Sequence, residues 1–311
     1  MKKYQAKEFI KIERKAVPKV WLVTASASGL GRHIAEAVLA SGDFLLATAR
    51  DPGRLDDLVK RYGDQVLTAP LDASDEAAAP AAVQAATAAF GRLDVVVNNA
   101  GYGDAAPIER VSWERFKELV DANFYGVLRV TRAALPVMRR QGSGCILQIS
   151  SMDGRLALPG STAYQGAKWD VGGFTEALAR EAAPFGVRIC ALEPGGMRSD
   201  WSARAKREAP DAIADYKATV ASVADTLKAH WGSENSDLAK LAQVILRLAA
   251  SERLPVHLLL SGEDVQSAAE AEAARAGEAA RWREIDLSTD AKARGAIPQG
   301  TRAKRGGIRA S

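Results

Sequence analysis

Short apolar segments alternate with longer segments of helical periodicity from Val20 onward, and this alternation limits the folds open to the chain. The apolar segments span residues 20–24, 44–48, 65–69, 93–97, 145–150, 187–193 and 256–260. Helical patterns fall between them, at residues 30–41, 54–62, 75–90, 113–140, 162–183 and 237–250. Strand–helix alternation favours right-handed crossovers, which place helices on both faces of one parallel sheet. We therefore predict a doubly wound α/β fold with a seven-stranded parallel sheet.

The apolar segments indicate buried strands, because strands covered on both faces lack polar alternation. All seven belong to one pattern, so we expect a single main domain over residues 18–262. Within it, residues 196–232 depart from the pattern and are predicted to form a substrate-binding loop region. Outside it we expect an N-terminal extension, a helical extension and a basic, disordered tail, at residues 1–17, 263–290 and 291–311.

Composition argues against several classes of protein. No run of eighteen apolar residues occurs, and residues 1–19 lack the apolar core of a signal peptide. The two cysteines, Cys145 and Cys190, and the three scattered histidines show no metal-ligand or disulfide spacing. We therefore expect a cytoplasmic protein that spans no membrane and binds no metal.

Both ends of the chain are basic. Residues 1–20 carry seven Lys or Arg and two acids, and residues 291–311 carry six Lys or Arg and no acid. Such tails can bind nucleic acid or anionic surfaces, which is one alternative for the function. No aromatic residues alternate with the charges in the tail, so we predict solvated ends and no nucleic-acid partner.

Small residues join the first predicted strand to the first helix, in the order Thr24-Ala-Ser-Ala-Ser-Gly-Leu-Gly31. Small residues let the backbone approach a pyrophosphate, and a helix N-terminus stabilises its charge. Glycine-rich turns also arise for steric reasons, but this one stands where a dinucleotide-binding loop is expected. The predicted contacts are Thr24, Ser26, Ser28, Gly29, Leu30 and Gly31.

A second motif begins where the fifth apolar segment ends. Ser150 and Ser151 follow that strand, and Tyr164 and Lys168 lie four residues apart on one face of the next predicted helix. A phenol has a reference pKa of about 10, and a nearby ammonium favours its ionised form. We therefore expect Lys168 to lower the pKa of Tyr164, so that the phenol can exchange a proton with a carbonyl oxygen.

These motifs occur together with Asn98-Asn-Ala-Gly101 and Pro194-Gly195. In order and spacing the set resembles the short-chain dehydrogenase/reductase family, of the single-domain type with a Tyr-x-x-x-Lys active site, over roughly residues 18–262. The resemblance implies a Rossmann fold and an NAD(P)-dependent oxidoreductase. One residue departs from the family pattern: Ala25 stands where the family has its first loop glycine, and a methyl group in that tight turn can perturb the loop or the cofactor.

The resemblance implies four catalytic residues. Tyr164 would be the general acid/base, and Lys168 would tune it and hold the nicotinamide ribose. Ser151, thirteen residues before the tyrosine, would hydrogen-bond the substrate oxygen, whereas alternation along the strand turns Ser150 into the packing. Asn123 would anchor a water for proton relay. By itself, Asn123 could equally be a polar residue that bonds backbone in a long helix.

The end of the second predicted strand bears on the choice of cofactor. An acid there would hold the ribose of NAD, and an arginine would accommodate the 2′-phosphate of NADP. The chain has Ala49 and Arg50 there, with Arg32 after the last loop glycine, and two guanidinium groups can bind a phosphate. Alternatively, both arginines are surface residues and Asp51 binds the ribose. We expect Asp51 to cap a turn with Pro52 instead, and predict NADP(H), with NAD(H) possible.

The resemblance implies further cofactor contacts. Asp72, after the third strand, would bond the adenine, although it could also cap a helix that leads into Ser74. The turn after the fourth strand would line the cofactor, and the segment after the sixth strand would contact the nicotinamide. The residues concerned are Asn98, Ala100, Gly101, Pro194, Gly195 and Ser199.

The expected reaction is hydride transfer between the nicotinamide and a carbonyl or secondary alcohol, and we predict reduction of a hydrophobic ketone or aldehyde. Apolar residues that could line the pocket are Tyr102, Met152, Leu156, Leu158, Met197, Trp201 and Trp231. By analogy with relatives, residues 113–140 and 162–183 would form a homodimer or homotetramer surface.

Two other functions also remain open. Extended epimerases or dehydratases carry Tyr-x-x-x-Lys, but with different glycine spacing and a larger C-terminal domain. Non-catalytic dinucleotide-binding regulators tend to lose the tyrosine or the lysine, and both are present here.

Overall fold

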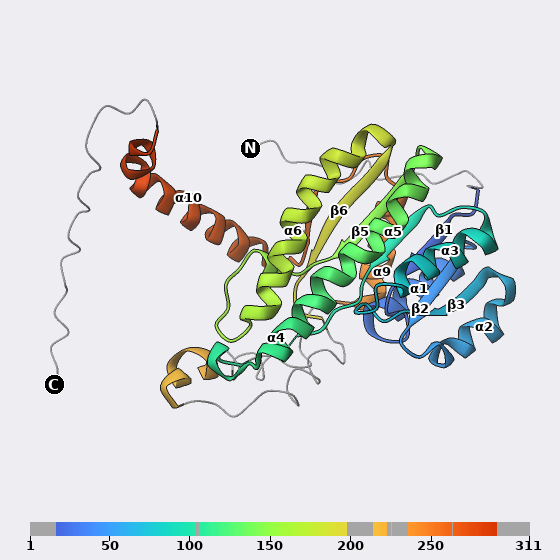
Figure 1. Cartoon of the computed structure of the whole chain (residues 1–311), viewed down its shortest axis with the longest axis horizontal. Helices are drawn as coiled ribbons and strands as arrows, with labels where there is room; N and C mark the ends of the chain where they lie inside the picture. The colour runs from blue at the N-terminus through green and yellow to red at the C-terminus, as the bar shows by residue number, and fades with distance from the viewer. Residues whose placement is uncertain are drawn as a thin grey trace. The chain divides into compact units, whose positions relative to one another are not determined.

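A computed structural model describes residues 17–103, 106–197, 214–222, 225, 236–262 and 264–290. The chain forms two compact units, residues 1–262 and 263–311. The first contains a seven-stranded sheet in the order β3-β2-β1-β4-β5-β6-β7, and every neighbouring pair is parallel (Figure 1). The strands are β1 (Val20–Val23), β2 (Phe44–Ala49), β3 (Val66–Pro70), β4 (Val95–Asn98), β5 (Gly144–Ile149), β6 (Val187–Pro194) and β7 (His257–Leu260). The predicted doubly wound fold is confirmed.

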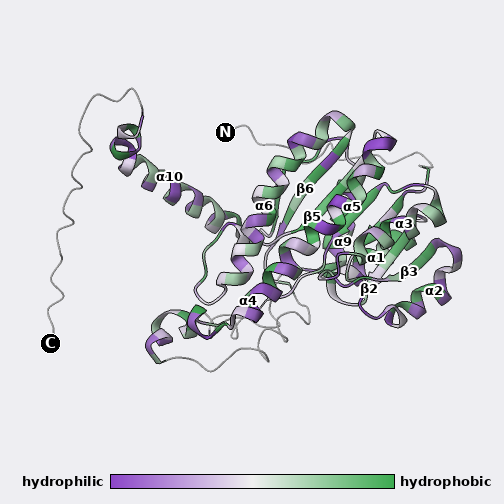
Figure 2. Cartoon of the chain, in the orientation of Figure 1, coloured by the Kyte–Doolittle hydropathy of each residue, from purple (hydrophilic) through white to green (hydrophobic). Residues whose placement is uncertain are grey.

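Alternate side chains of the strands pack into two separate cores, one on each face of the sheet. Trp21 and Val23 of β1 belong to the core that contains α1 and α9, whereas Val20 and Leu22 belong to the core that contains α3, α5 and α6. This division follows from the two-residue period of a strand. It explains why green predominates along the strands in Figure 2. The helices are α1 (Gly29–Ala40), α2 (Asp56–Tyr62), α3 (Ala78–Phe90), α4 (Trp113–Val120), α5 (Gly126–Gln141), α6 (Thr162–Ala182) and α9 (Leu238–Ala250).

The strand order reverses at the centre of the sheet. The chain runs from β1 outward to β2 and β3 and then returns to β4, which pairs with the other edge of β1. At such a switch point the loops that follow the two central strands diverge and leave a crevice at their carboxyl ends, where ligands of this architecture bind. The loops after Val23 and Asn98 therefore flank the expected site.

The helix predicted over residues 113–140 is present and contains a π-helical turn. The segment η5 (Asp121–Tyr125) is a π-helix that separates α4 from α5, and it contains Asn123. A π-helical turn widens the helix by one residue and is frequent at functional sites. Pro136 lies inside α5, which continues to Gln141.

The second unit contains one described helix, α10 (Asp264–Ser288), in the segment predicted to be a helical extension. The basic tail and all but the last residue of the N-terminal extension lie outside the described residues, as does most of the 196–232 loop region. Within the described part of the chain, every helix is too short or too polar to cross a membrane.

Candidate active site

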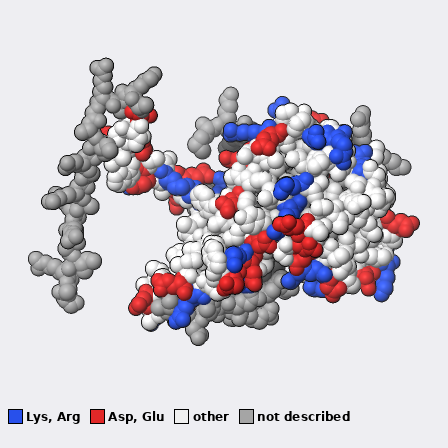
Figure 3. All heavy atoms as spheres, in the orientation of Figure 1, with Lys and Arg blue, Asp and Glu red and all other residues white. Residues whose placement is uncertain are grey.

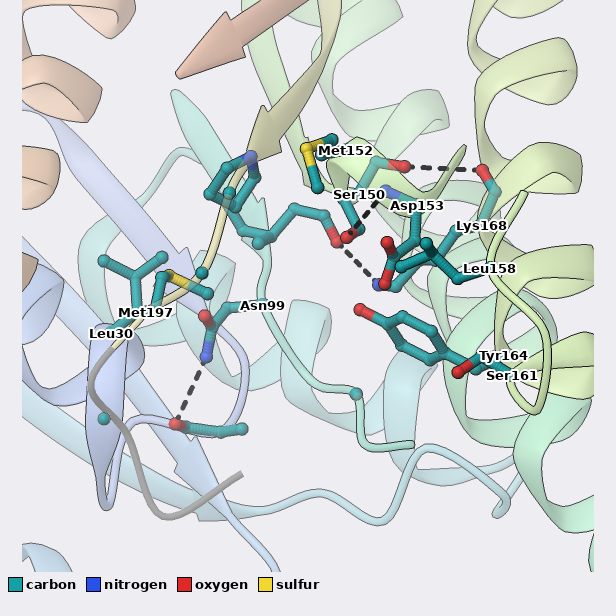
Figure 4. Close-up of a pocket in the computed structure, with 18 of the residues that line it drawn as sticks. Leu30, Asn99, Ser150, Met152, Asp153, Leu158, Ser161, Tyr164, Lys168 and Met197 are labelled. Atoms are coloured by element: carbon teal, nitrogen blue, oxygen red, sulfur yellow. Dashed lines mark hydrogen bonds between the residues drawn. The ribbon is translucent and has the colours of Figure 1, made fainter. Parts of the chain in front are cut away.

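A cavity of about 260 Å³ opens at the carboxyl ends of the central strands (Figure 4). Its walls come from four segments that are distant in the sequence: the loop after β1, the turn after β4, the segment from the end of β5 into α6, and the segment after β6. The described lining includes Ala25, Ser28, Gly29, Leu30, Asn99, Gly101, Ser150, Ser151, Met152, Asp153, Leu158, Ser161, Tyr164, Lys168, Pro194, Gly195 and Met197. The structure thus brings the predicted phosphate loop and the predicted catalytic motif into one site.

Ala25 adopts a left-handed backbone conformation, with φ of 54°, and no other non-glycine residue of the described chain has positive φ. This conformation crowds the Cβ of an L-residue against backbone, at a cost of about 1–2 kcal/mol. The family glycine that Ala25 replaces would not incur this cost, so the alanine leaves strain in the loop.

Replacing Ala25 with glycine is therefore expected to stabilise the protein by about 0.5–1 kcal/mol, after the greater entropy of glycine in the unfolded chain is subtracted. Urea denaturation of Ala25→Gly would measure the gain. The control is Ala27→Gly in the same loop. Ala27 does not have positive φ, so this substitution relieves no strain and should destabilise the protein. Equal changes in the free energy of unfolding for the two variants would contradict the inference that Ala25 is strained.

Buried hydroxyls hold the loop to the turn after β4. Thr24 Oγ1 accepts hydrogen bonds from the backbone N–H groups of Asn99, at 2.8 Å, and Ala100, at 2.9 Å. Ser26 Oγ donates to the carbonyl of Val23. Thr24 and Ser26, predicted as cofactor contacts, therefore direct their side chains into the loop's own hydrogen bonds.

At two glycines, neighbouring atoms lie so close to the backbone that a side chain would not fit. A Cβ on Gly31 would lie 2.3 Å from the carbonyl oxygen of Ala25 and 2.5 Å from Asn99 Nδ2. A Cβ on Gly101 would lie 2.6 Å from Asn123 Oδ1 and 3.5 Å from Lys168 Nζ. Gly101 thus leaves the space through which Asn123 faces Lys168.

Asn123 is fully buried in the π-helical turn. Its Nδ2 donates to the carbonyls of Tyr102, at 2.6 Å, and Leu119, at 2.9 Å. Its Oδ1 is buried and has no hydrogen-bond partner among the described residues. Because buried carbonyl oxygens are nearly always satisfied, this acceptor is available to a donor beside Gly101.

Tyr164 and Lys168 are both buried, and Lys168 Nζ lies 5.6 Å from the centre of the tyrosine ring. Lys168 Nζ donates to the carbonyl of Ile149 at 2.8 Å. Ser151 hydrogen-bonds the phenol, whereas Ser150 Oγ donates to the backbone of Lys168. The four predicted catalytic residues lie together, and of the two serines Ser151 is the one that meets Tyr164.

The expectation that Lys168 lowers the pKa of Tyr164 is wrong in this structure. Burial raises the pKa of Tyr164 well above its ordinary value, the charge of Asp153 raises it further, and the hydrogen bond from Ser151 opposes both. Burial also lowers the pKa of Lys168 to about 8, against the effect of Asp153. The reason is that desolvation disfavours the charged form of both groups, so the ammonium that should stabilise a phenolate is itself destabilised.

Comparison with known proteins identifies the family. Residues 19–210 match the family model described as short chain dehydrogenase. The chain belongs to the short-chain dehydrogenase/reductase family. Oxidoreductase BOA17 of Botryotinia fuckeliana is 42% identical over 87% of this chain and 99% of its own.

Solved structures agree with this assignment. A short-chain dehydrogenase from Streptomyces avermitilis superposes with a TM-score of 0.80 at 33% identity, covering 88% of this chain and all of that one. An alcohol dehydrogenase from Thermococcus sibiricus, complexed with 5-hydroxy-NADP, gives 0.64 at 25% identity over 78% and 96% of the two chains. The protein is an NAD(P)-dependent oxidoreductase of the short-chain dehydrogenase/reductase family.

The residues of this short-chain dehydrogenase/reductase fit a dinucleotide. Ser28 is the N-cap of α1 but makes no capping hydrogen bond with its side chain, and the first turn carries no acid. The positive end of the helix dipole therefore faces the pocket at Gly29 and Leu30, where a pyrophosphate would be stabilised. The absence of side chains at Gly31 and Gly101 also fits the binding of a dinucleotide.

Arg32, predicted to bind a 2′-phosphate, is held by two carboxylates. Its Nε lies 2.7 Å from Glu36 Oε1, and its two terminal nitrogens bond both oxygens of Asp57 on α2. Arg50 is exposed directly after β2. Asp51 caps the turn η2 (Pro52–Leu55) by accepting from the N–H of Gly53, which confirms the expected cap.

Two other predicted contacts use their side chains elsewhere. Asp72 Oδ1 accepts from the N–H and hydroxyl of Ser74, at 2.9 and 2.7 Å, in a tight turn. Asp72 does not cap a helix, since α3 begins at Ala78. Asn98 Nδ2 donates to Gln148 and Thr131 in the core, and Asn99 lines the pocket in its place. Ser199, Trp201 and Trp231 lie outside the described residues, and Tyr102 and Leu156 are not in the described lining.

Sequence reasoning missed Asp153. It lies in the pocket wall beside Tyr164 and Lys168 (Figure 4), and its backbone N–H donates to Ser151 Oγ at 3.1 Å. The available signal was an acid two residues after the predicted catalytic serine, but only the fold shows that its charge acts on both Tyr164 and Lys168.

Proposed function

We propose that this protein reduces a hydrophobic ketone or aldehyde with NADPH, using Tyr164 as the proton donor. The observation that carries the proposal is that Tyr164, Ser151 and Lys168 share one cavity with the N-terminus of α1. A carbonyl compound and a dinucleotide could therefore meet there.

When bound, the nicotinamide cofactor supplies or accepts the hydride at the substrate carbon. Ser151 and Tyr164 donate hydrogen bonds to the substrate oxygen, and the phenol proton passes to that oxygen as negative charge develops on it. A raised pKa keeps the phenol protonated near neutral pH, which suits donation in the direction of reduction. Lys168 and a water held by Asn123 Oδ1 would then return a proton to Tyr164.

The described lining supports an apolar substrate. Met152, Leu158 and Met197 contribute flexible or branched apolar side chains to the pocket. Methionine adapts to irregular shapes, so this wall would accept more than one hydrophobic group. Asp153 adds a negative charge, which would disfavour a substrate carboxylate near the reacting carbon.

The preference for NADP(H) over NAD(H) rests on the end of β2. No acid stands there: Ala49 is buried, and Asp51 is used as a cap. Arg50 is exposed and acts electrostatically on Asp72, so its charge lies near the ends of β2 and β3. Arg32 would join it on a 2′-phosphate by exchanging the exposed Asp57 for the phosphate.

A screen of hydrophobic ketones and aldehydes with NADPH and NADH tests the proposal. We expect faster oxidation of NADPH, and a decrease of about 10-fold or more in the NADPH/NADH ratio of kcat/KM in Arg50→Ala, since a charge-assisted hydrogen bond contributes about 1.5–3 kcal/mol. Arg54→Ala in the adjacent turn is the control. Turnover of no carbonyl by the wild type would overturn the reaction, and equal use of both cofactors would overturn the preference.

We also infer a homo-oligomer with small-molecule partners only. Trp113, Tyr125 and Trp169, on α4, η5 and α6, are 65%, 46% and 45% exposed. Lys and Arg are interspersed with Asp and Glu on the face drawn in Figure 3, which does not favour nucleic acid. Light scattering of the intact protein tests the assembly, and a monomer mass would refute it.

A further inference from the structure

Glu193 is a buried carboxylate immediately behind the pocket. It is the last residue but one of β6, and its side chain is 3% exposed. The next two residues, Pro194 and Gly195, line the cavity. A carboxylate shielded from solvent is tolerated only when cations and hydrogen-bond donors surround it. The partners of Glu193 therefore show which segments of the chain the carboxylate connects.

The two partners of Glu193 come from different segments. Arg155 Nε lies 2.5 Å from Oε2, and His257 Nδ1 lies 2.7 Å from Oε1. His257 is the first residue of β7, and its other ring nitrogen lies 3.2 Å from Glu176 on α6, a residue that is 59% exposed. One carboxylate therefore joins the ends of two strands to the segment that carries Arg155.

Arg155 ends the turn that presents Ser151. The N–H of Asp153 donates to Ser151 Oγ, that of Gly154 to the carbonyl of Ser151 at 3.0 Å, and that of Arg155 to the carbonyl of Met152 at 2.8 Å. These consecutive bonds make residues 151–155 one compact turn (η6, Met152–Gly154, with its flanks). A constraint on the Arg155 guanidinium therefore acts on the position of Ser151.

We propose that Glu193 is a positioning residue for the reductase reaction: through Arg155 it holds the turn 151–155 against the pocket wall and so keeps Ser151 in contact with Tyr164. The expected effect on kcat rests on the proposed function, whereas the expected effect on the order of residues 151–155 does not. Its ion pair is with Arg155 at the end of the turn, so it acts on Ser151 through the turn.

Glu193→Gln removes the charge and keeps the shape. We expect hydrogen exchange in the peptide that covers residues 151–158 to increase about 10-fold, with no change in α1. We expect kcat for a ketone to fall about 10-fold while the Kd of NADPH stays within 2-fold, because the dinucleotide loop is not involved. Arg155→Met should reproduce both effects, and Arg155→Lys should recover part of them.

The double variant Glu193→Gln/Arg155→Met should lose less than the sum of the two single variants, since both substitutions remove the Glu193–Arg155 ion pair. Glu176→Gln is the matched control: it removes the other carboxylate on His257 without touching Arg155, and exchange in 151–158 should not change. Wild-type exchange in this peptide for a folded Glu193→Gln, or additive losses in the double variant, would overturn the proposal.

If Glu193→Gln does not fold, the two Arg155 variants test the same ion pair from its other side. The Arg155 side chain is 25% exposed, so its substitution disturbs the core less. A wild-type protein that reduces no carbonyl would overturn the proposed function, while the exchange measurements would still decide the positioning role.

Discussion

Tyr164→Phe is expected to reduce kcat about 10²–10⁴-fold, the range over which a positioned general acid contributes. The substitution removes one oxygen from a buried ring and keeps the ring packing. The Kd of NADPH should therefore change little, and the loss should appear in kcat. Steady-state reduction of a ketone, together with NADPH titration by fluorescence, measures the two quantities separately.

The matched control for this prediction is Tyr62→Phe on α2, which removes the same atom from a ring that packs against the core beside α1 and α9. It should leave kcat unchanged. Reduction at the wild-type rate by a folded Tyr164→Phe protein would exclude Tyr164 as the proton donor. Loss of thermal stability equal to that of a core deletion would instead assign the oxygen a structural role.

Gly31→Ala should weaken dinucleotide binding by up to about 100-fold. The new methyl group would overlap the carbonyl oxygen of Ala25 and the amide of Asn99, both fixed by the hydrogen bonds around Thr24. Overpacking of this kind costs about 1–3 kcal/mol, and relief requires the phosphate loop to move. NADPH titration and urea denaturation would measure how the cost divides between binding and folding.

Gly173→Ala on α6 makes the same chemical change where nothing lies within 4 Å of the added carbon. It should bind NADPH normally and gain about 1 kcal/mol of stability from helix propensity. If Gly31→Ala behaved like Gly173→Ala, the close approach in the first loop would not constrain the cofactor site.

Much of the fold follows from patterns within short segments. The apolar residues of β1 and β4 lie where the sequence places strands, and the order of strands and helices determines the parallel sheet. Turn chemistry is equally local, so Asp51 before Pro52 was identified as a cap. The family motifs likewise located Tyr164, Lys168 and Ser151, because their spacing along the chain reflects one strand, one turn and one helix.

What the sequence did not reveal depends on contacts between distant segments. The sequence predicts a regular helix around Asn123, whereas the structure has a π-turn there that contacts α6, and Asn123 Oδ1 has no hydrogen-bond partner among the described residues. Arg32 was assigned to a phosphate, but Asp57, 25 residues away, binds it in the structure.

Sequence by itself determined the parallel sheet and the membership of the family, since periodicity and motif spacing are properties of neighbouring residues. Only the tertiary structure decided the directions in which the pKa values of Tyr164 and Lys168 shift, the strain at Ala25 and the partners of Glu193. The physical reason is that the protonation of a side chain depends on burial and on charges brought near by folding, and neither is encoded in the few residues beside it.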